Sequence, residues 1–256
     1  MVGSNLAKTS GRKITIEGKV LKNTKVIQPR LSNLQLKRYM YVKKNIFSQN
    51  NNIVCKGFCF TNETLSEAVL KWCGDEEGKN EMIAKYGDIS TWDTSKVTQM
   101  ASLFRFIPLQ PNQHVPGADT FNDDISNWNV SNVTTMYSMF EGAAQFNQDL
   151  GNWNVSNVID MEAMFNGASN FEQDLSNWNV SGVKLNHLMF KNAISFSATG
   201  LENWNLSSIE TIGGQNLSYD MLKNANVNQN QKDLLEESWV TQNNYFLQAE
   251  FDGIFL

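Results

Sequence analysis

A tryptophan that returns about every 25 residues is the feature that most restricts how this chain can fold. Five of the seven tryptophans share this phase: Trp92, Trp128, Trp153, Trp178 and Trp204. The last three intervals are 25, 25 and 26 residues, and the first is 36 residues, one period plus eleven inserted residues. Self-similarity at a fixed period of this length is typical of repeat proteins, in which each unit packs on its neighbours.

Other apolar positions keep the same phase. Columns of valine, methionine and phenylalanine follow the tryptophan at fixed distances: Val97, Val133, Val158, Val183 and Ile209; Met100, Met136 and Met161; Phe104, Phe140, Phe165 and Phe190. Asn186 interrupts the methionine column in the fourth unit. The apolar surface of one unit is too small to offset the entropy of ordering it, so stacked neighbours must add burial.

Each unit is predicted to contain one short strand and one short helix. Alternation of apolar and polar residues around the tryptophan predicts a strand at about Ser126–Val130. Apolar residues at three- and four-residue spacing from Val133 to Phe140 predict a short helix, closed by Gly142 as its C-cap. The spacing Leu-x-x-Trp-x-Val is that of leucine-rich repeats. The predicted fold class is therefore an α/β repeat, a leucine-rich-repeat-like solenoid of short parallel strands and short helices.

Both ends of such a stack need a cap with a polar outer surface. Residues 61–72 have the pattern of an amphipathic helix with Thr61 or Asn62 as N-cap, and residues 233–240 predict a second helix. Alternation in residues 13–20 predicts β-structure near the N-terminus. The predicted parts are a β-rich basic arm (1–57), an N-terminal helical cap (58–87), about five repeats (88–216) with an insert (106–118), and a C-terminal cap (217–256).

Charge separates a basic arm from an acidic body. Residues 1–56 carry twelve Lys and Arg and one acid, which gives +11, and residues 57–256 carry nine and twenty-five, which gives −16. This asymmetry predicts that the arm anchors the protein to an acidic surface, either its own body or another subunit. The predicted anchoring residues are Arg12, Lys13, Lys19, Lys22, Lys25, Arg30, Lys37, Arg38, Lys43 and Lys44. Nucleic acid is a weaker candidate partner, because the acidic body would repel it.

Two surfaces are candidates for binding a partner. The residues beside each tryptophan should point away from the core as columns of asparagine: Asn127, Asn129, Asn152, Asn154, Asn177, Asn179, Asn203 and Asn205. The alternative is that these columns are a ladder of amides that stiffens the stack. The insert is the second candidate, since inserts in repeat proteins often form binding loops, and an inert loop is its alternative. Its candidate residues are Pro108, Pro111, His114 and Pro116.

No set of residues predicts catalysis, a cofactor or a metal site. The chain lacks a phosphate-binding loop and a nucleophile elbow, and its two histidines stand in unrelated contexts. An aspartate recurs four residues before each of four tryptophans: Asp88, Asp124, Asp149 and Asp174. One carboxylate per unit without a calcium loop predicts turn capping. Three cysteines with a poor zinc spacing predict buried free thiols, with one disulfide as the alternative.

The repeat units resemble a known family. The strings FNQDLGNWNVSNVIDMEAMFNGA and FEQDLSNWNVSGVKLNHLMF are similar to BspA-like leucine-rich-repeat proteins, whose 25-residue type is typical of mycoplasma surface lipoproteins and also occurs in algae, other bacteria and large DNA viruses. The segments LSEAVLKWCGDEEGKNEMIAKYGDISTWDTSKV and MLKNANVNQNQKDLLEESWV resemble the two caps of that family. The resemblance covers roughly residues 58–242 and implies a non-enzymatic interaction or surface module.

Together these features predict a structural protein that binds other proteins. The repeats would contact partners, and the arm would anchor the chain to a larger assembly, such as the virion of a large DNA virus. A cell-surface adhesin is the alternative. No run of eighteen apolar residues predicts a membrane span, and the first residues lack the apolar segment of a signal peptide. A location inside a cell or a virion is therefore expected over the cell surface.

Overall fold

The computed structural model describes residues 58–108, 114–212, 215–216, 220–240 and 242, with residues 15–16 and 19–20 described by their backbone. It divides the chain into two units, Met1–Gln49 and Asn50–Leu256. In the first unit, β1 (Thr15–Ile16) pairs antiparallel with β2 (Lys19–Val20). Except for the backbone of Lys19, the predicted anchoring residues of the arm lie outside the described residues.

Two helices begin the second unit: α2 (Asn62–Gly74) and α3 (Glu76–Tyr86). Thr61 caps α2 through a reciprocal pair of hydrogen bonds, in which its hydroxyl accepts from the Thr64 amide and the Thr64 hydroxyl accepts from the Thr61 amide. The buried residues of α2 follow helical spacing and form one apolar stripe; they are Leu65, Ala68, Val69 and Trp72. This stripe covers the first repeat, where the Trp72 ring stands edge-on to Trp92 at 5.4 Å.

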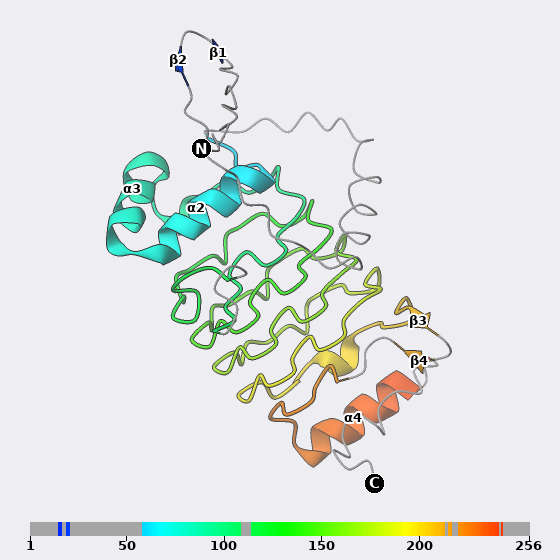
Figure 1. The fold of residues 1–256 in the computed structure, drawn as a ribbon. Helices are drawn as coiled ribbons and strands as arrows, with labels where there is room; N and C mark the ends of the chain where they lie inside the picture. Colours follow the sequence, from blue (N-terminus) through cyan, green and yellow to red (C-terminus); the bar gives the residue numbers. More distant parts are fainter. Residues whose placement is uncertain are drawn as a thin grey trace, which may run out of the picture. The chain divides into compact units, whose positions relative to one another are not determined.

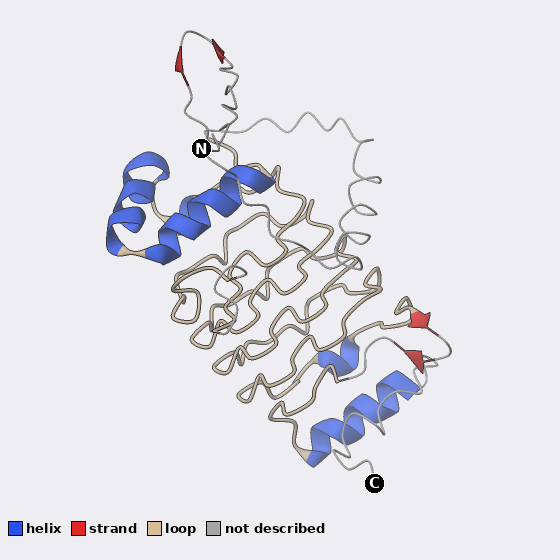
Figure 2. Ribbon diagram, in the orientation of Figure 1, coloured by secondary structure: helices blue, strands red, loops and turns tan. Residues whose placement is uncertain are grey.

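Five repeats follow one another between α2 and the C-terminal helix (Figure 1). The prediction of a solenoid built from parallel strands and short helices is wrong. From Trp92 to Ile209 the described residues contain no strand and no α-helix, only turns and the 3₁₀ helix η2 (Leu201–Asn203), and Figure 2 draws the repeats as loops. The strand-like pairing consists of isolated parallel bridges: Cys59 with Asp93, Gln99 with Thr135, Thr135 with Asp160, and Asp160 with Leu185.

Local hydrogen bonds replace the strand that was expected around each tryptophan. The Trp153 amide donates to the Leu150 carbonyl, so the segment forms a tight turn. Side-chain oxygens of Asp149 and Asn154 accept from the amides two residues further on, at distances of 2.8 and 3.2 Å. Aspartate and asparagine favour such turns because their side chains replace a ladder partner. The alternation in the sequence thus comes from turns that return every second side chain to the core.

A left-handed backbone prevents the helix that was expected after each turn. Ser138, Ala163 and Leu188 occupy equivalent positions with φ of 51°, 55° and 58°, a conformation that an α-helix cannot contain. Their segment bonds to the next repeat instead: the Ser138 amide donates to the Glu162 carbonyl at 2.9 Å. Gly142 has the positive φ of a C-cap, 75°, but ends no helix. The three- and four-residue spacing arises from consecutive tight turns.

Aromatic rings stack along the core of the repeats. Neighbouring rings of one phenylalanine column lie 5.4–5.5 Å apart and nearly parallel: Phe104, Phe140, Phe165 and Phe190. A second column packs against the first at 4.0–4.1 Å: Phe121, Phe146, Phe171 and Phe196. Beside them, the Trp153 indole donates to the Ile125 carbonyl of the preceding repeat at 3.3 Å. Trp128, Trp178 and Trp204 make the same bond to the preceding repeat.

The helix α4 (Gln229–Val240) closes the other end of the stack. The Trp239 indole donates to the Leu201 carbonyl at 3.1 Å, so it continues the tryptophan series although it belongs to a helix. A short hairpin of β3 (Thr211–Ile212) and β4 (Gln215–Asn216) precedes α4 in the sequence. No helix in the described part of the chain is both long and apolar enough to span a lipid bilayer.

Candidate interaction surface

The eight candidate asparagines are all exposed, and we call this surface the asparagine face. In the column after the tryptophan, the Asn154 side-chain oxygen accepts from the Ser156 amide at 3.2 Å and from its hydroxyl at 2.7 Å. Asn129 and Asn179 make the same pair of bonds. These bonds lie within one repeat, so this column holds turns and does not link repeats.

The column before the tryptophan makes no such side-chain hydrogen bonds. Among the described residues, the side chains of Asn127, Asn152 and Asn177 make no intramolecular hydrogen bond. Each stands at the third position of a turn closed by the tryptophan amide, where asparagine is favoured by its backbone preferences. The repetition of this column is therefore explained by turn formation alone.

A ladder of amides does link the repeats, but at positions that the sequence argument missed. The Asn122 side-chain oxygen accepts from the Asn147 amide at 2.8 Å, and the Asn147 oxygen accepts from the Glu172 amide at 3.1 Å. Gln148 and Gln173 donate to the same two asparagines. In the sequence, this ladder is marked by the two polar residues that follow each phenylalanine of the second column. A search restricted to the exposed columns beside the tryptophan does not find them.

A second surface is formed where backbone hydrogen bonds join the repeats. We call it the ladder face and define it as residues 98–105, 134–141, 159–166 and 184–191. Alternate amides donate to the next repeat: Met136 to Asp160, Ser138 to Glu162 and Phe140 to Met164, followed by Met161 to Leu185, Ala163 to His187 and Phe165 to Met189. These bonds measure 2.8–2.9 Å. The backbone of the ladder face is thus hydrogen-bonded from one repeat to the next, and the sequence did not single out this surface.

The insert packs against the body at both of its described ends. The Val115 amide donates to the Arg105 carbonyl at 2.7 Å, and the His114 ring lies 5.1 Å from that of Phe106. Pro108 and Pro116 are exposed. Pro111, the remaining candidate of this loop, lies outside the described residues. The structure therefore places His114 against Phe106, at the other described end of the insert, and leaves the two described prolines accessible.

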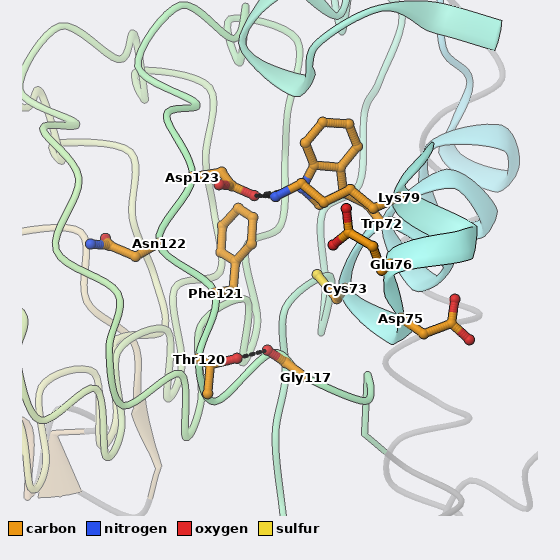
Figure 3. A pocket seen from close by; sticks show the side chains of 10 residues that line it. All are labelled: Trp72, Cys73, Asp75, Glu76, Lys79, Gly117, Thr120, Phe121, Asn122 and Asp123. Carbon is orange, nitrogen blue, oxygen red and sulfur yellow. Dashed lines mark hydrogen bonds and ion pairs between the residues drawn. The ribbon is translucent and has the colours of Figure 1, made fainter. Parts of the chain in front are cut away.

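A pocket of about 290 Å³ lies between the N-terminal helices and the second repeat (Figure 3). The Asp123 carboxylate accepts from the Trp72 indole at 2.6 Å and from the Lys79 ammonium at 2.9 Å. The same ammonium lies 4.9 Å from the centre of the Trp72 ring. These charged and polar groups already pair with one another. The pocket therefore marks the place where the N-terminal helices pack against the repeats.

Cys73 lines this pocket, and its thiol should be unreactive in the native protein. Burial raises the pKa of Cys73 to about 12, the Asp123 carboxylate also raises it, and Lys79 lowers it. Because only the thiolate attacks, native Cys73 at pH 8 should be alkylated on the order of a thousandfold more slowly than in urea. Mass spectrometry after timed iodoacetamide treatment measures this, and equal rates in buffer and urea would contradict the burial.

The same shift sets the pH dependence that Cys73 contributes to stability. A folded-state pKa above the unfolded value means that folding favours the protonated thiol. The contribution is therefore complete below pH about 8.5, the unfolded pKa, and is lost as the pH rises toward about 12. Of the other cysteines, Cys59 is in a disulfide, which corrects the expectation that all are free thiols, and Cys55 lies outside the described residues.

The recurring aspartates cap turns, as the sequence predicts. Asp124, Asp149 and Asp174 each accept from the amide two residues further on at 2.8 Å. Asp88 accepts from the Ser90 hydroxyl at 2.6 Å and from its amide at 3.0 Å, and these bonds hold the pKa of Asp88 below its ordinary value. The carboxylates thus serve the backbone of their own repeat.

A family model matches more than half of the chain. The model of a family described as "Mycoplasma protein of unknown function, DUF285" matches residues 79–113 and 111–239. The two matched segments include most of the helix α3, all five tryptophans of the repeat and α4 up to Trp239. No curated protein and no solved structure matches the chain.

Proposed function

We propose a function for this chain, which belongs to the family described as Mycoplasma protein of unknown function, DUF285. We infer that the chain is a non-enzymatic protein whose repeats bind other proteins. The finer proposal is that it is a BspA-like surface module, for which the repeat strings and caps are the support. One observation carries the proposal. The residues that recur from repeat to repeat are used for core packing and turns, which leaves an extended rigid surface for contact.

Rigidity favours binding by such a surface. The stacked repeats are joined by backbone bonds of 2.8–3.0 Å along the ladder face, and their phenylalanine columns are fully buried. A surface that is ordered before it binds loses little conformational entropy on association, so more of the contact energy appears as affinity. The recurring aspartates and asparagines are engaged in turns, which gives them a use that is not catalytic.

Chemical cross-linking of the native protein in its own cells or particles tests this function. A specific protein should be enriched by the tagged wild-type chain and identified by mass spectrometry. The matched control is Trp153→Ala, which removes a core side chain while leaving the surface sequence intact. Enrichment of no protein by the wild type, or of the same proteins by a Trp153→Ala chain that circular dichroism shows to be unfolded, would contradict a folded binding surface.

The charge asymmetry of the sequence supports a second element of the proposal, anchoring by the basic arm. We expect a chain lacking residues 1–50 to keep its repeats folded, because both caps and all five repeats lie downstream. Its thermal midpoint should match that of the full chain, whereas its co-sedimentation with the native assembly should be lost. In the full chain this association should weaken as salt rises, since exposed charges are screened.

Three outcomes separate the alternatives for the arm. Normal incorporation of the truncated chain at low salt would refute anchoring. Loss of the folded repeats on truncation would instead make the arm part of the fold. Association that is abolished by nuclease would favour nucleic acid as the partner.

Labelling of the protein on intact cells by a membrane-impermeant reagent would favour the adhesin alternative over a virion component.

A further inference from the structure

The surface around the asparagine face carries no charge. Four positions that are not buried follow one another around each tryptophan of the second to fifth repeats: the residue before it and those one, three and four places after it. We call these four columns the neutral strip. They are Asn127, Asn129, Ser131 and Asn132; Asn152, Asn154, Ser156 and Asn157; Asn177, Asn179, Ser181 and Gly182; and Asn203, Asn205, Ser207 and Ser208. Charged residues make up 18% of the chain and are rarely buried, so about three or more of these sixteen positions would be expected to carry a charge.

The first repeat shows that the turns of the strip accept charged residues. Asp93 stands at the position equivalent to Asn129, and its carboxylate accepts from the Ser95 amide at 3.0 Å. The Asn129 side-chain oxygen accepts from the Ser131 amide at the same distance. Lys96 occupies the fourth column of the first repeat. Turn formation therefore explains why a short polar side chain recurs in the strip, and it does not explain why none of the sixteen is charged.

The side chains of the neutral strip also offer unused hydrogen-bonding groups. Asn127, Asn152 and Asn177 are exposed, and their side-chain amides form no hydrogen bond within the described part of the chain. Each of these amides therefore offers donors and an acceptor. In the next column, the turn engages the Asn154 side-chain oxygen through the amide and hydroxyl of Ser156, which leaves the Asn154 amino group as a donor. The strip thus presents donors and acceptors without charge.

These groups recur with the step of the stack. The Trp153 indole donates to the Ile125 carbonyl of the preceding repeat, and the Trp178 indole donates to Leu150 in the same way. Because each tryptophan is tied to the preceding repeat by the same bond, the asparagines beside it occupy equivalent places in successive repeats. A row of identical groups on an ordered backbone loses little conformational entropy when it binds a ligand.

The composition of the strip argues against several classes of ligand. Nucleic acids and other polyanions are bound through Lys and Arg, which the strip lacks, and the exposed carboxylates of Asp124, Asp149 and Asp174 stand three residues before its first column. Protein interfaces depend on aromatic side chains and arginine, and the sixteen residues include neither. A neutral polymer that repeats hydroxyl groups fits the strip, because a hydroxyl both donates and accepts hydrogen bonds.

We propose that the neutral strip binds an uncharged polysaccharide, whose hydroxyl groups pair with the asparagine amides of successive repeats. This inference goes beyond the proposed function, because it assigns a second class of ligand to a surface that lacks the residues of a protein interface. Protein partners contact another face of the repeats. Each hydrogen bond to the sugar replaces one to water and gains little, so the affinity comes from many contacts along one polymer chain.

Co-sedimentation of the purified full chain with washed cellulose, chitin, curdlan and starch granules tests the ligand class. At least one of these neutral polysaccharides should retain the chain. Retention should not weaken as salt rises, because the strip has no charge to be screened. Soluble oligosaccharides cut from the retained polymer should compete better as their length increases, whereas the monosaccharide should compete weakly.

Two double variants with the same change of charge locate the surface. Asn152→Asp with Asn177→Asp removes two donors from the strip and adds two carboxylates, so it should weaken binding at least about tenfold, since one hydrogen bond is worth roughly fivefold. Asn152→Ala with Asn177→Ala, which adds no charge, should weaken binding by a similar factor. The matched control is Gln145→Glu with Asn170→Asp, two exposed residues on adjacent repeats outside the strip. It should change binding less than about twofold, because solvent screens the added charges. Thermal midpoints verify that each variant is folded.

The outcomes separate this inference from the proposed function, which the cross-linking experiment tests by itself. Retention by none of the four polysaccharides would overturn the ligand class. Retention that is lost at high salt would assign the binding to the basic arm and would overturn it too. Equal retention of the strip variants and the Gln145 and Asn170 control would overturn the neutral strip as the site. A cross-linked protein partner that is lost in Asn152→Ala with Asn177→Ala would assign the strip to protein binding instead.

Discussion

Trp153→Ala should lower the free energy of unfolding by about 3–5 kcal/mol, the range measured when large buried aromatic side chains are truncated. Trp153 is 4% exposed and lies in the middle repeat. The repeats on either side cannot move in to fill the cavity left by the indole, because each is packed against its own neighbours. The loss also leaves the Ile125 carbonyl without its indole donor. Urea denaturation followed by circular dichroism measures the change.

Two further variants divide this effect into its parts. Trp153→Phe keeps an aromatic ring but removes the donor, so it should cost about 1–3 kcal/mol, the penalty for an unpaired buried carbonyl together with some lost volume. Asn152→Ala alters the exposed neighbour and should change stability by less than about 0.5 kcal/mol. Equal stability of Trp153→Ala and Asn152→Ala would show that the register of the repeats is wrong.

The repeat register could be predicted because burial imposes a periodicity that the sequence displays. The tryptophan, methionine and phenylalanine columns are buried as the phase requires, and the capping aspartates bond as expected. The backbone between them could not be predicted by the same method. Turns joined by left-handed residues such as Ser138 and Ala163 return side chains to the core at spacings that also suit strands and helices. Periodicity reports which side chains are buried and does not report how the backbone connects them.

The candidate surfaces show the same limit of prediction from sequence. A search for repeated exposed residues finds Asn152 and Asn154, whose recurrence reflects their use in turns. Tyr137, Glu162 and His187 form no pattern, because each repeat has a different residue there. Their common row became visible only through the backbone bonds between repeats.

The largest contrast is expected between two glycines at equivalent positions, Gly142 and Gly167. Both have a left-handed backbone, with φ of 75° and 74°. A Cβ atom on Gly142 would lie 1.9 Å from the Phe106 carbonyl oxygen, whereas one on Gly167 would meet nothing closer than 3.7 Å. The clash arises because the backbone of the preceding repeat turns into the insert at Phe106, where the Phe106 amide bonds to Glu141.

Gly167→Ala should therefore cost only the left-handed conformation, about 1–2 kcal/mol. Gly142→Ala should cost about 4 kcal/mol, because about 1–3 kcal/mol of overpacking adds to the same conformational penalty. Asn192 occupies the equivalent position in the next repeat with φ of 59°, so Gly167→Asn should be tolerated better than Gly167→Ala. Unfolding curves in urea give all three values. If the two alanine variants were equally stable, the insert would not begin against Gly142, and the placement of the first repeat on the second would have to be revised.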